Sequence, residues 1–172
     1  RGLAQELTST GELALLAVSA EWQGNHFLAL RVGKWAAARG LSVGALSADH
    51  LHVPSDEGLA ALAAAADSER PTVATLLPAT TWFLMTDEAA PARRFIDAGV
   101  PVALGTDFNP GTSPTPNLPL VMTVACLEMR LTPSEALAAV TINAAHAAGV
   151  GDEAGSLEPG KAADLVIWRA TT

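Results

Sequence analysis

The stretch that most constrains the fold is residues 102–112, which read Val-Ala-Leu-Gly-Thr-Asp-Phe-Asn-Pro-Gly-Thr. Its apolar start is too short for a helix and ends in Gly-Thr-Asp, which is typical of a buried parallel strand followed by a loop. Asp107 then lies at the carboxyl end of this strand, where (β/α) barrels place the residues of their active sites. A lone carboxylate at that position predicts a metal ligand or a proton acceptor.

The rest of the chain alternates between short apolar segments and segments with helical periodicity. Residues 13–20 fit either a strand or a short helix. The other predicted strands are residues 42–47 and 72–77, and the predicted helices are residues 28–39, 54–66, 91–98, 117–129 and 133–147. This alternation favours a parallel α/β architecture. Residues 155–168 predict a turn and a terminal strand.

Length and charge restrict what the chain can form and bind. A chain of 172 residues with 49% hydrophobic content can bury one substantial core. A complete eight-stranded (β/α) barrel typically needs ~250 residues, so we expect only part of a barrel. The net charge of -8 argues against nucleic acid as a partner, because phosphate binding needs clustered Lys and Arg.

The charged residues, the start of the sequence and the single cysteine together predict where the protein is located in the cell. Charged residues break every run before it reaches the ~18 residues of a membrane-spanning helix. The first residues lack the layout of a signal peptide, and Cys126 is the only cysteine, which excludes an intrachain disulfide. We therefore expect a cytoplasmic protein that does not bind membranes.

A resemblance becomes specific when four segments are taken in order. Residues 103–111, 119–122, 131–137 and 140–145 together resemble the imidazolonepropionase family of metal-dependent amidohydrolases. The resemblance covers residues 41 to 168 well and residues 1–40 poorly. It implies the carboxyl-terminal half of such an enzyme.

The resemblance also implies a fold, an activity and a cofactor. Residues 1–150 would form part of a TIM (β/α) barrel of the metal-dependent hydrolase type, and residues 151–172 would return to a small β-sandwich. The activity would be the opening of the cyclic amide of 4-imidazolone-5-propanoate to N-formimidoyl-L-glutamate in histidine degradation. Zinc or iron would be the cofactor, the partner a small-molecule substrate, and a homodimer the candidate oligomer.

The family pattern implies roles for individual residues. Asp107 would be a metal ligand and the proton carrier, and His50, in Ser-Ala-Asp-His, would lie near the reactive water. Asn109, Gly111 and Thr112 would hold the substrate or the ring-opened product. Without the resemblance, Asp107 would be a cap of a loop or helix, His50 a hydrogen-bonded loop residue, and Asn-Pro-Gly a turn.

Two departures from the family pattern leave alternatives open. His26 has about the spacing of a metal-binding histidine, but Phe-Leu-Ala follows it where the family has a carboxylate. The His-x-His pair of the superfamily is absent, since His50 and His52 follow a different strand. The alternatives are another amidohydrolase, such as a deaminase or cyclic amidase, or a non-catalytic α/β fragment without a complete metal site.

Overall fold

A computed structural model describes residues 45–69, 71–86 and 89–167 of the chain. These residues contain three strands and six helices. The predicted helix 28–39, the ambiguous residues 13–20 and His26 lie outside the described residues. None of the helices in the described part is long and apolar enough to cross a membrane.

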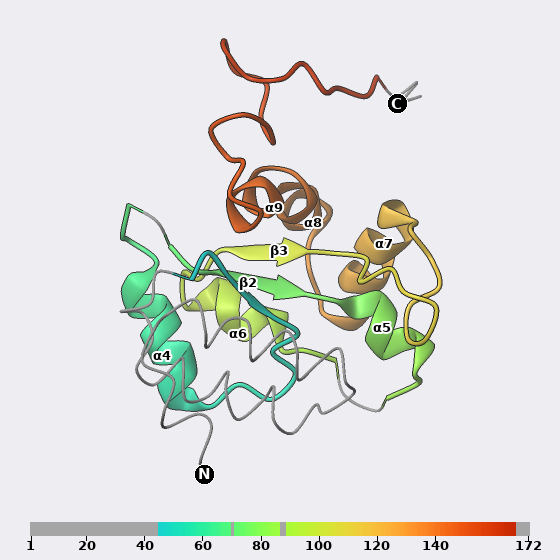
Figure 1. Cartoon of the computed structure of the whole chain (residues 1–172). Coiled ribbons are helices and arrows are strands. Elements are labelled where there is room, and N and C mark those ends of the chain that lie inside the picture. Colours follow the sequence, from blue (N-terminus) through green and yellow to red (C-terminus); the bar gives the residue numbers. More distant parts are fainter. Residues whose placement is uncertain (1–44, 70, 87–88, 168–172) are drawn as a thin grey trace, which may run out of the picture.

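The strands form one parallel sheet in the order β1, β2, β3. Their bounds are Ser47–Asp49 for β1, Val73–Leu76 for β2 and Val102–Leu104 for β3. Ala48 lies opposite Ala74, and Ala74 lies opposite Val102, so the strands are aligned with almost no offset. Their carboxyl ends therefore meet at one edge of the sheet, the end toward which the arrows point in Figure 1.

The helices surround this sheet. Figure 1 shows α8 and α9 beside β3, α4 and α6 on the opposite side of the picture, and α5 and α7 together at the end where the strands point. The core between them is apolar, with Leu76, Phe95 and Val121 fully buried. The helix bounds are Asp56–Ala65 (α4), Pro78–Phe83 (α5), Ala92–Asp97 (α6), Leu118–Glu128 (α7), Pro133–Val140 (α8) and Ile142–Ala147 (α9).

The α/β alternation predicted from the sequence is confirmed, and local capping explains where several helices begin. The Ser55 hydroxyl accepts a hydrogen bond from the Gly58 amide at 3.1 Å at the start of α4. Thr132 and Glu135 form the predicted capping box, because each side chain accepts from the backbone amide of the other, at 3.3 and 2.8 Å. These helix starts depend on residues within one turn, which is why the sequence predicts them well.

The single helix predicted over residues 133–147 is wrong, because the chain breaks at Thr141. This residue has φ -118° and ψ -94°, and it separates α8 from α9. Three β-branched residues, 140 to 142, meet at the break, and the Thr141 hydroxyl donates to the Leu137 carbonyl at 2.7 Å. A helix α5 was also missed, because Pro78 both ends β2 and occupies the first turn of the next helix.

The break lets α9 cover the open edge of β3. The Pro101 carbonyl accepts from the Ala74 amide at 2.9 Å, so the next carbonyl, that of Val102, points away from β2. The Asn143 side-chain amide donates to this Val102 carbonyl at 2.8 Å. A side chain of α9 thus satisfies a backbone group that the sheet leaves unpaired.

The predicted terminal strand of a small β-sandwich is not confirmed. The described residues 151–167 contain turns, bends and irregular backbone but no strand. The side chains of Leu165, Val166 and Ile167 are 54%, 71% and 88% exposed. A strand needs a partner to pair with, and the described residues offer this segment none.

Candidate active site

The predicted site residues follow different strands of the sheet but lie at the same edge. His50 comes directly after β1, and its amide donates to the Thr75 carbonyl of β2 at 2.9 Å. Asp107 follows the last residue of β3 by a short Gly-Thr linker. Because the three strands are parallel, both residues lie at the carboxyl edge, as the sequence predicted.

A shared pocket around Asp107 and His50 stays a prediction. Two cavities among the described residues are lined by neither side chain. One cavity lies between Ile96 of α6 and Leu131 before α8, and the other lies between α5 and α7.

The carboxylate of Asp107 is held by one buried hydroxyl. Thr80, in the first turns of α5, donates from Oγ1 to Asp107 Oδ2 at 2.7 Å. The Thr80 side chain is only 7% exposed, whereas Asp107 is half-buried. Asp107 also has a left-handed backbone with φ 49°, which is uncommon outside glycine and frequent at functional sites. Among the described residues no group donates to Oδ1 of Asp107, so this oxygen is available as an acceptor.

The loop after Asp107 is organised by the side chain of Asn109. Its Oδ1 accepts from the amides of Gly111 and Thr112 at 2.9 and 2.7 Å. Its Nδ2 donates to the Asp107 carbonyl at 2.7 Å and to the Thr112 hydroxyl at 2.9 Å. The backbone of Asn109 pairs with Ser113, whose buried hydroxyl donates to the Thr106 carbonyl at 2.6 Å.

The three residues predicted to bind substrate are therefore brought together, but they bind one another in this structure. The polar groups of Asn109 are used within the loop, and Gly111 and Thr112 turn their amides toward it. Direct contact of Asn109 with a substrate would require exchange of these hydrogen bonds. The role of this loop in substrate binding stays a prediction.

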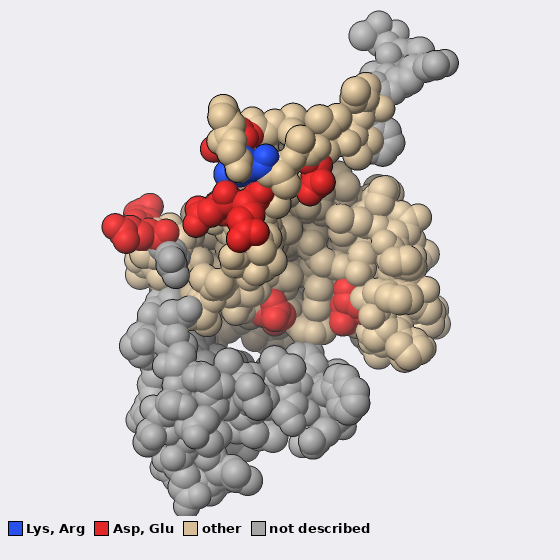
Figure 2. Space-filling view, turned by 45° about the horizontal axis from the view of Figure 1, so that its top comes forward, with Lys and Arg blue, Asp and Glu red and all other residues tan. Residues whose placement is uncertain are grey.

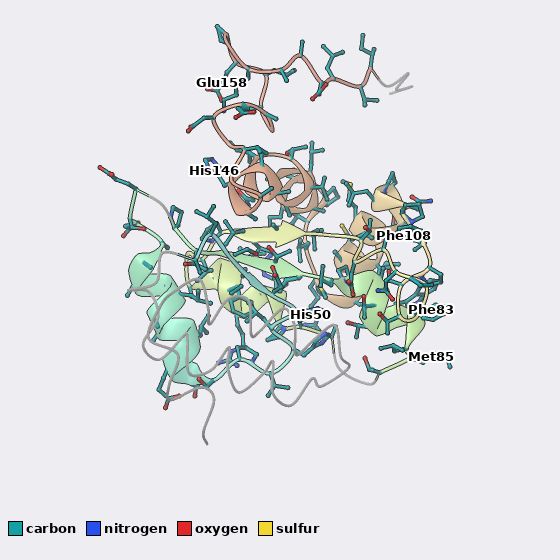
Figure 3. All side chains as sticks on the ribbon, in the orientation of Figure 1. His50, Phe83, Met85, Phe108, His146 and Glu158 are labelled. Atoms are coloured by element: carbon teal, nitrogen blue, oxygen red, sulfur yellow. The ribbon has the colours of Figure 1, made fainter. Side chains whose placement is uncertain are left out.

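The histidines differ in their placement. His50 and Leu51 both have left-handed backbones, with φ 67° and 50°, so the chain turns sharply after β1. The rings of His50 and His52 have centroids 6.1 Å apart and are tilted by 37°. His146 lies on α9, away from the end of the sheet where Phe108 marks the Asp107 loop (Figure 3).

The described residues do not form a complete metal site. Catalytic zinc is usually bound by three protein side chains. Within residues 45–69, 71–86 and 89–167, no group of three His, Cys, Asp or Glu side chains lies together in a way that could hold a metal ion. Asp107 could supply one ligand through its available oxygen. The predicted ligand His26 lies outside the described residues.

Two of the resolved electrostatic shifts, those of Arg93 and Glu135, lie away from this edge, between α6 and α8. The pKa of the Glu135 carboxyl is lowered, first by the hydrogen bond from the Thr132 amide and then by the hydrogen bond from Arg93. Arg93 donates to both oxygens of Glu135, at 2.9 and 2.8 Å, and to Asp97 at 2.9 Å. The two hydrogen bonds to Glu135 join α6 to α8, whereas the bond to Asp97 lies within α6. On the face shown in Figure 2, most charged side chains are acidic.

Thr80 is the site residue that the sequence analysis missed. The signal that could have found it is its position: a polar residue shortly after β2, at the same edge as the residues that follow β1 and β3. Pro78 was interpreted only as the residue that ends the strand. The contact joins residues 27 positions apart, so no local pattern contains both partners.

Comparison with known proteins shows the family of this chain. Residues 36–172 match the model of the amidohydrolase family. The chain is 64% identical over 128 residues to imidazolonepropionase from Geobacillus thermodenitrificans, covering 74% of this chain and 29% of that protein. It is 54% identical over 126 residues to the imidazolonepropionase of Bacillus velezensis, covering 73% and 29%. The chain thus spans less than a third of the length of these relatives.

Two solved structures share the fold. An adenosine deaminase from Xanthomonas campestris with bound zinc superposes with a TM-score of 0.62 at 24% identity, covering 87% of this chain and 33% of that one. E. coli guanine deaminase gives a TM-score of 0.60 at 20% identity, covering 73% and 30%. The α/β fold is therefore that of these proteins. Since the family model matches well over half of the sequence, the chain belongs to the amidohydrolase family.

Proposed function

We propose that this chain is part of an imidazolonepropionase, which opens the ring of 4-imidazolone-5-propanoate to N-formimidoyl-L-glutamate in histidine degradation. One observation carries the proposal. The carboxylate of Asp107 is fixed at the carboxyl edge of the sheet with one oxygen available. It lies within a segment that resembles enzymes named imidazolonepropionase at 64% identity.

Asp107 would move the proton in this hydrolysis. As water attacks the carbonyl carbon of the ring, Oδ1 of Asp107 accepts the proton that the water releases. The bond between this carbon and the ring nitrogen then breaks, and the same oxygen returns the proton to the leaving nitrogen. A positioned carboxylate in this role typically contributes about 10²–10⁴-fold to the rate. His50, at the same edge, would lie near the attacking water.

The loop of Asn109, Gly111 and Thr112 would hold the substrate or the ring-opened product. The hydrogen bonds within this loop support its role as a rigid wall of the site. Gly111 is exposed and has no side chain, so a ligand can approach its backbone closely. The site would also contain zinc or iron, for which the described residues supply too few ligands.

The finer architecture is part of the same proposal. Residues 1–150 would belong to a TIM barrel, and residues 151–172 would lead back to a β-sandwich beside it. The three parallel strands and the amidohydrolase match support this arrangement. Eight strands close such a barrel, so most of them lie outside the described residues. A cytoplasmic location and a homodimer complete the proposal.

A chimera tests the proposal in a complete protein. The aligned 128 residues of the Geobacillus thermodenitrificans enzyme are replaced by those of this chain. We expect the chimera to consume 4-imidazolone-5-propanoate, measured by the loss of its ultraviolet absorption. Asp107→Asn should lower kcat by about 10²–10⁴-fold, because the amide cannot accept the proton.

Asp97→Asn is the matched control for this experiment. It makes the same chemical change in an exposed carboxylate on α6, whose only described partner is Arg93. We expect the control to keep the activity of the chimera. A folded chimera that deaminates adenosine or guanine instead would favour another amidohydrolase. One that hydrolyses none of these compounds would favour a non-catalytic fragment.

A further inference from the structure

We propose that Thr80 is a positioning residue for Asp107. Its hydroxyl binds Oδ2 of the carboxylate and so leaves Oδ1 as the oxygen that accepts the proton. The inference rests on the proposed function, since it assigns which oxygen of Asp107 reacts.

The place of Thr80 in the fold makes this hydroxyl a fixed donor. Thr80 lies in the first turn of α5, which starts at Pro78, two residues after the end of β2. Its carbonyl accepts from the Leu84 amide at 3.0 Å, so its backbone belongs to the helix. With 7% of its surface exposed, its side chain has little room to change rotamer.

The carboxylate is also fixed from the side of its backbone. The side-chain Nδ2 of Asn109 donates to the backbone carbonyl of Asp107 at 2.7 Å, and the Ser113 hydroxyl donates to the carbonyl of Thr106 at 2.6 Å. These two bonds hold the left-handed backbone of Asp107. The hydrogen bond from the Thr80 hydroxyl then restricts rotation of the carboxylate about the side-chain bonds of Asp107.

The neighbouring residue, Thr81, provides a control. Thr81 lies on the same helix and is 6% exposed, so its burial matches that of Thr80. Among the described residues, however, its hydroxyl has no hydrogen-bond partner. Replacing each threonine by valine removes one hydroxyl from an equally buried site, but only one of the two removals affects Asp107.

The test is NMR spectroscopy of the full 172-residue chain, without substrate or metal, at one fixed pH. The ¹³Cγ signal of Asp107 is assigned by its loss in Asp107→Asn. We expect Thr80→Val to shift this signal, Thr80→Ser to restore it, and Thr81→Val to leave it in place. An unchanged signal in Thr80→Val would overturn the proposal, and so would equal shifts in both valine variants.

A second measurement covers the case in which Thr80→Val does not fold. In the unmutated chain the hydroxyl proton of Thr80 should exchange slowly enough to be observed. Asp107→Ala should speed its exchange by about tenfold or more, because the bond to a charged acceptor no longer has to open. A Thr80 hydroxyl that exchanges equally fast in both proteins would overturn the proposal. Ring opening by the chimera is a separate result, so the two proposals can fail independently.

Discussion

The side chain of Asn109 should contribute measurably to the stability of the Asp107 loop, and Asn109→Ala tests this. The substitution removes hydrogen bonds to four groups: the amides of Gly111 and Thr112, the Thr112 hydroxyl and the Asp107 carbonyl. Gly111 is exposed, so water can replace its bond at little cost. The other three groups belong to partly buried residues.

The expected loss follows from these three bonds. A typical hydrogen bond contributes about 0.5–1.5 kcal/mol net, and partial exposure places each of the three in the lower half of that range. We therefore expect Asn109→Ala to lower the free energy of unfolding by about 2 kcal/mol. Urea unfolding followed by circular dichroism measures this as a lower midpoint with an unchanged slope.

Asn109→Asp is the matched control. Aspartate keeps an oxygen that accepts from the amides of Gly111 and Thr112, but it loses the donor to the Asp107 carbonyl. The free energy of unfolding of Asn109→Asp should therefore lie between those of the wild type and of Asn109→Ala. An alanine variant that unfolds within about 0.5 kcal/mol of the wild type would refute the argument, because surface changes without structural roles have effects of that size. That outcome would mean that the side chain of Asn109 contributes little to the stability of the loop and can bind a ligand instead.

Two further predictions concern the parts of the molecule that support this edge. Phe95 of α6 is fully buried, so Phe95→Ala should lower the free energy of unfolding by about 3–5 kcal/mol, and a smaller loss in urea unfolding would contradict the described core. The lowered pKa of Glu135 means that its stabilising effect is present above the ordinary carboxyl pKa of 4.5 and is lost as the pH falls through the lower value of the folded state. Glu135→Gln should therefore flatten the acid limb of a plot of stability against pH, and an unchanged limb would contradict the contacts with Thr132 and Arg93.

The comparison of sequence with structure separates local signals from contacts across the fold. The strand β2, the helix α4 and the capping box of α8 were predicted well, because each depends on residues that are neighbours in sequence. The same holds for the position of Asp107 at the carboxyl end of β3, which an apolar run ending in Gly-Thr-Asp already indicated.

What the sequence did not predict depends on distant partners. The break before α9 lets Asn143 reach the Val102 carbonyl, 41 residues earlier in the chain. The bond between Thr80 and Asp107 likewise joins the start of α5 to the loop after β3, and these two segments meet through the sheet. The terminal strand predicted within residues 155–168 is not confirmed, because the described residues offer it no sheet to join.

The central claim is that the available oxygen of Asp107 faces the reacting nitrogen of the substrate. A crystal structure of the chimera with N-formimidoyl-L-glutamate tests it most directly. We predict that a nitrogen of the formimidoyl group lies within about 3.2 Å of Oδ1 of Asp107, with Thr80 still bound to Oδ2. Product bound elsewhere, for example in the cavity between α5 and α7, with Oδ1 turned away from it, would contradict the account.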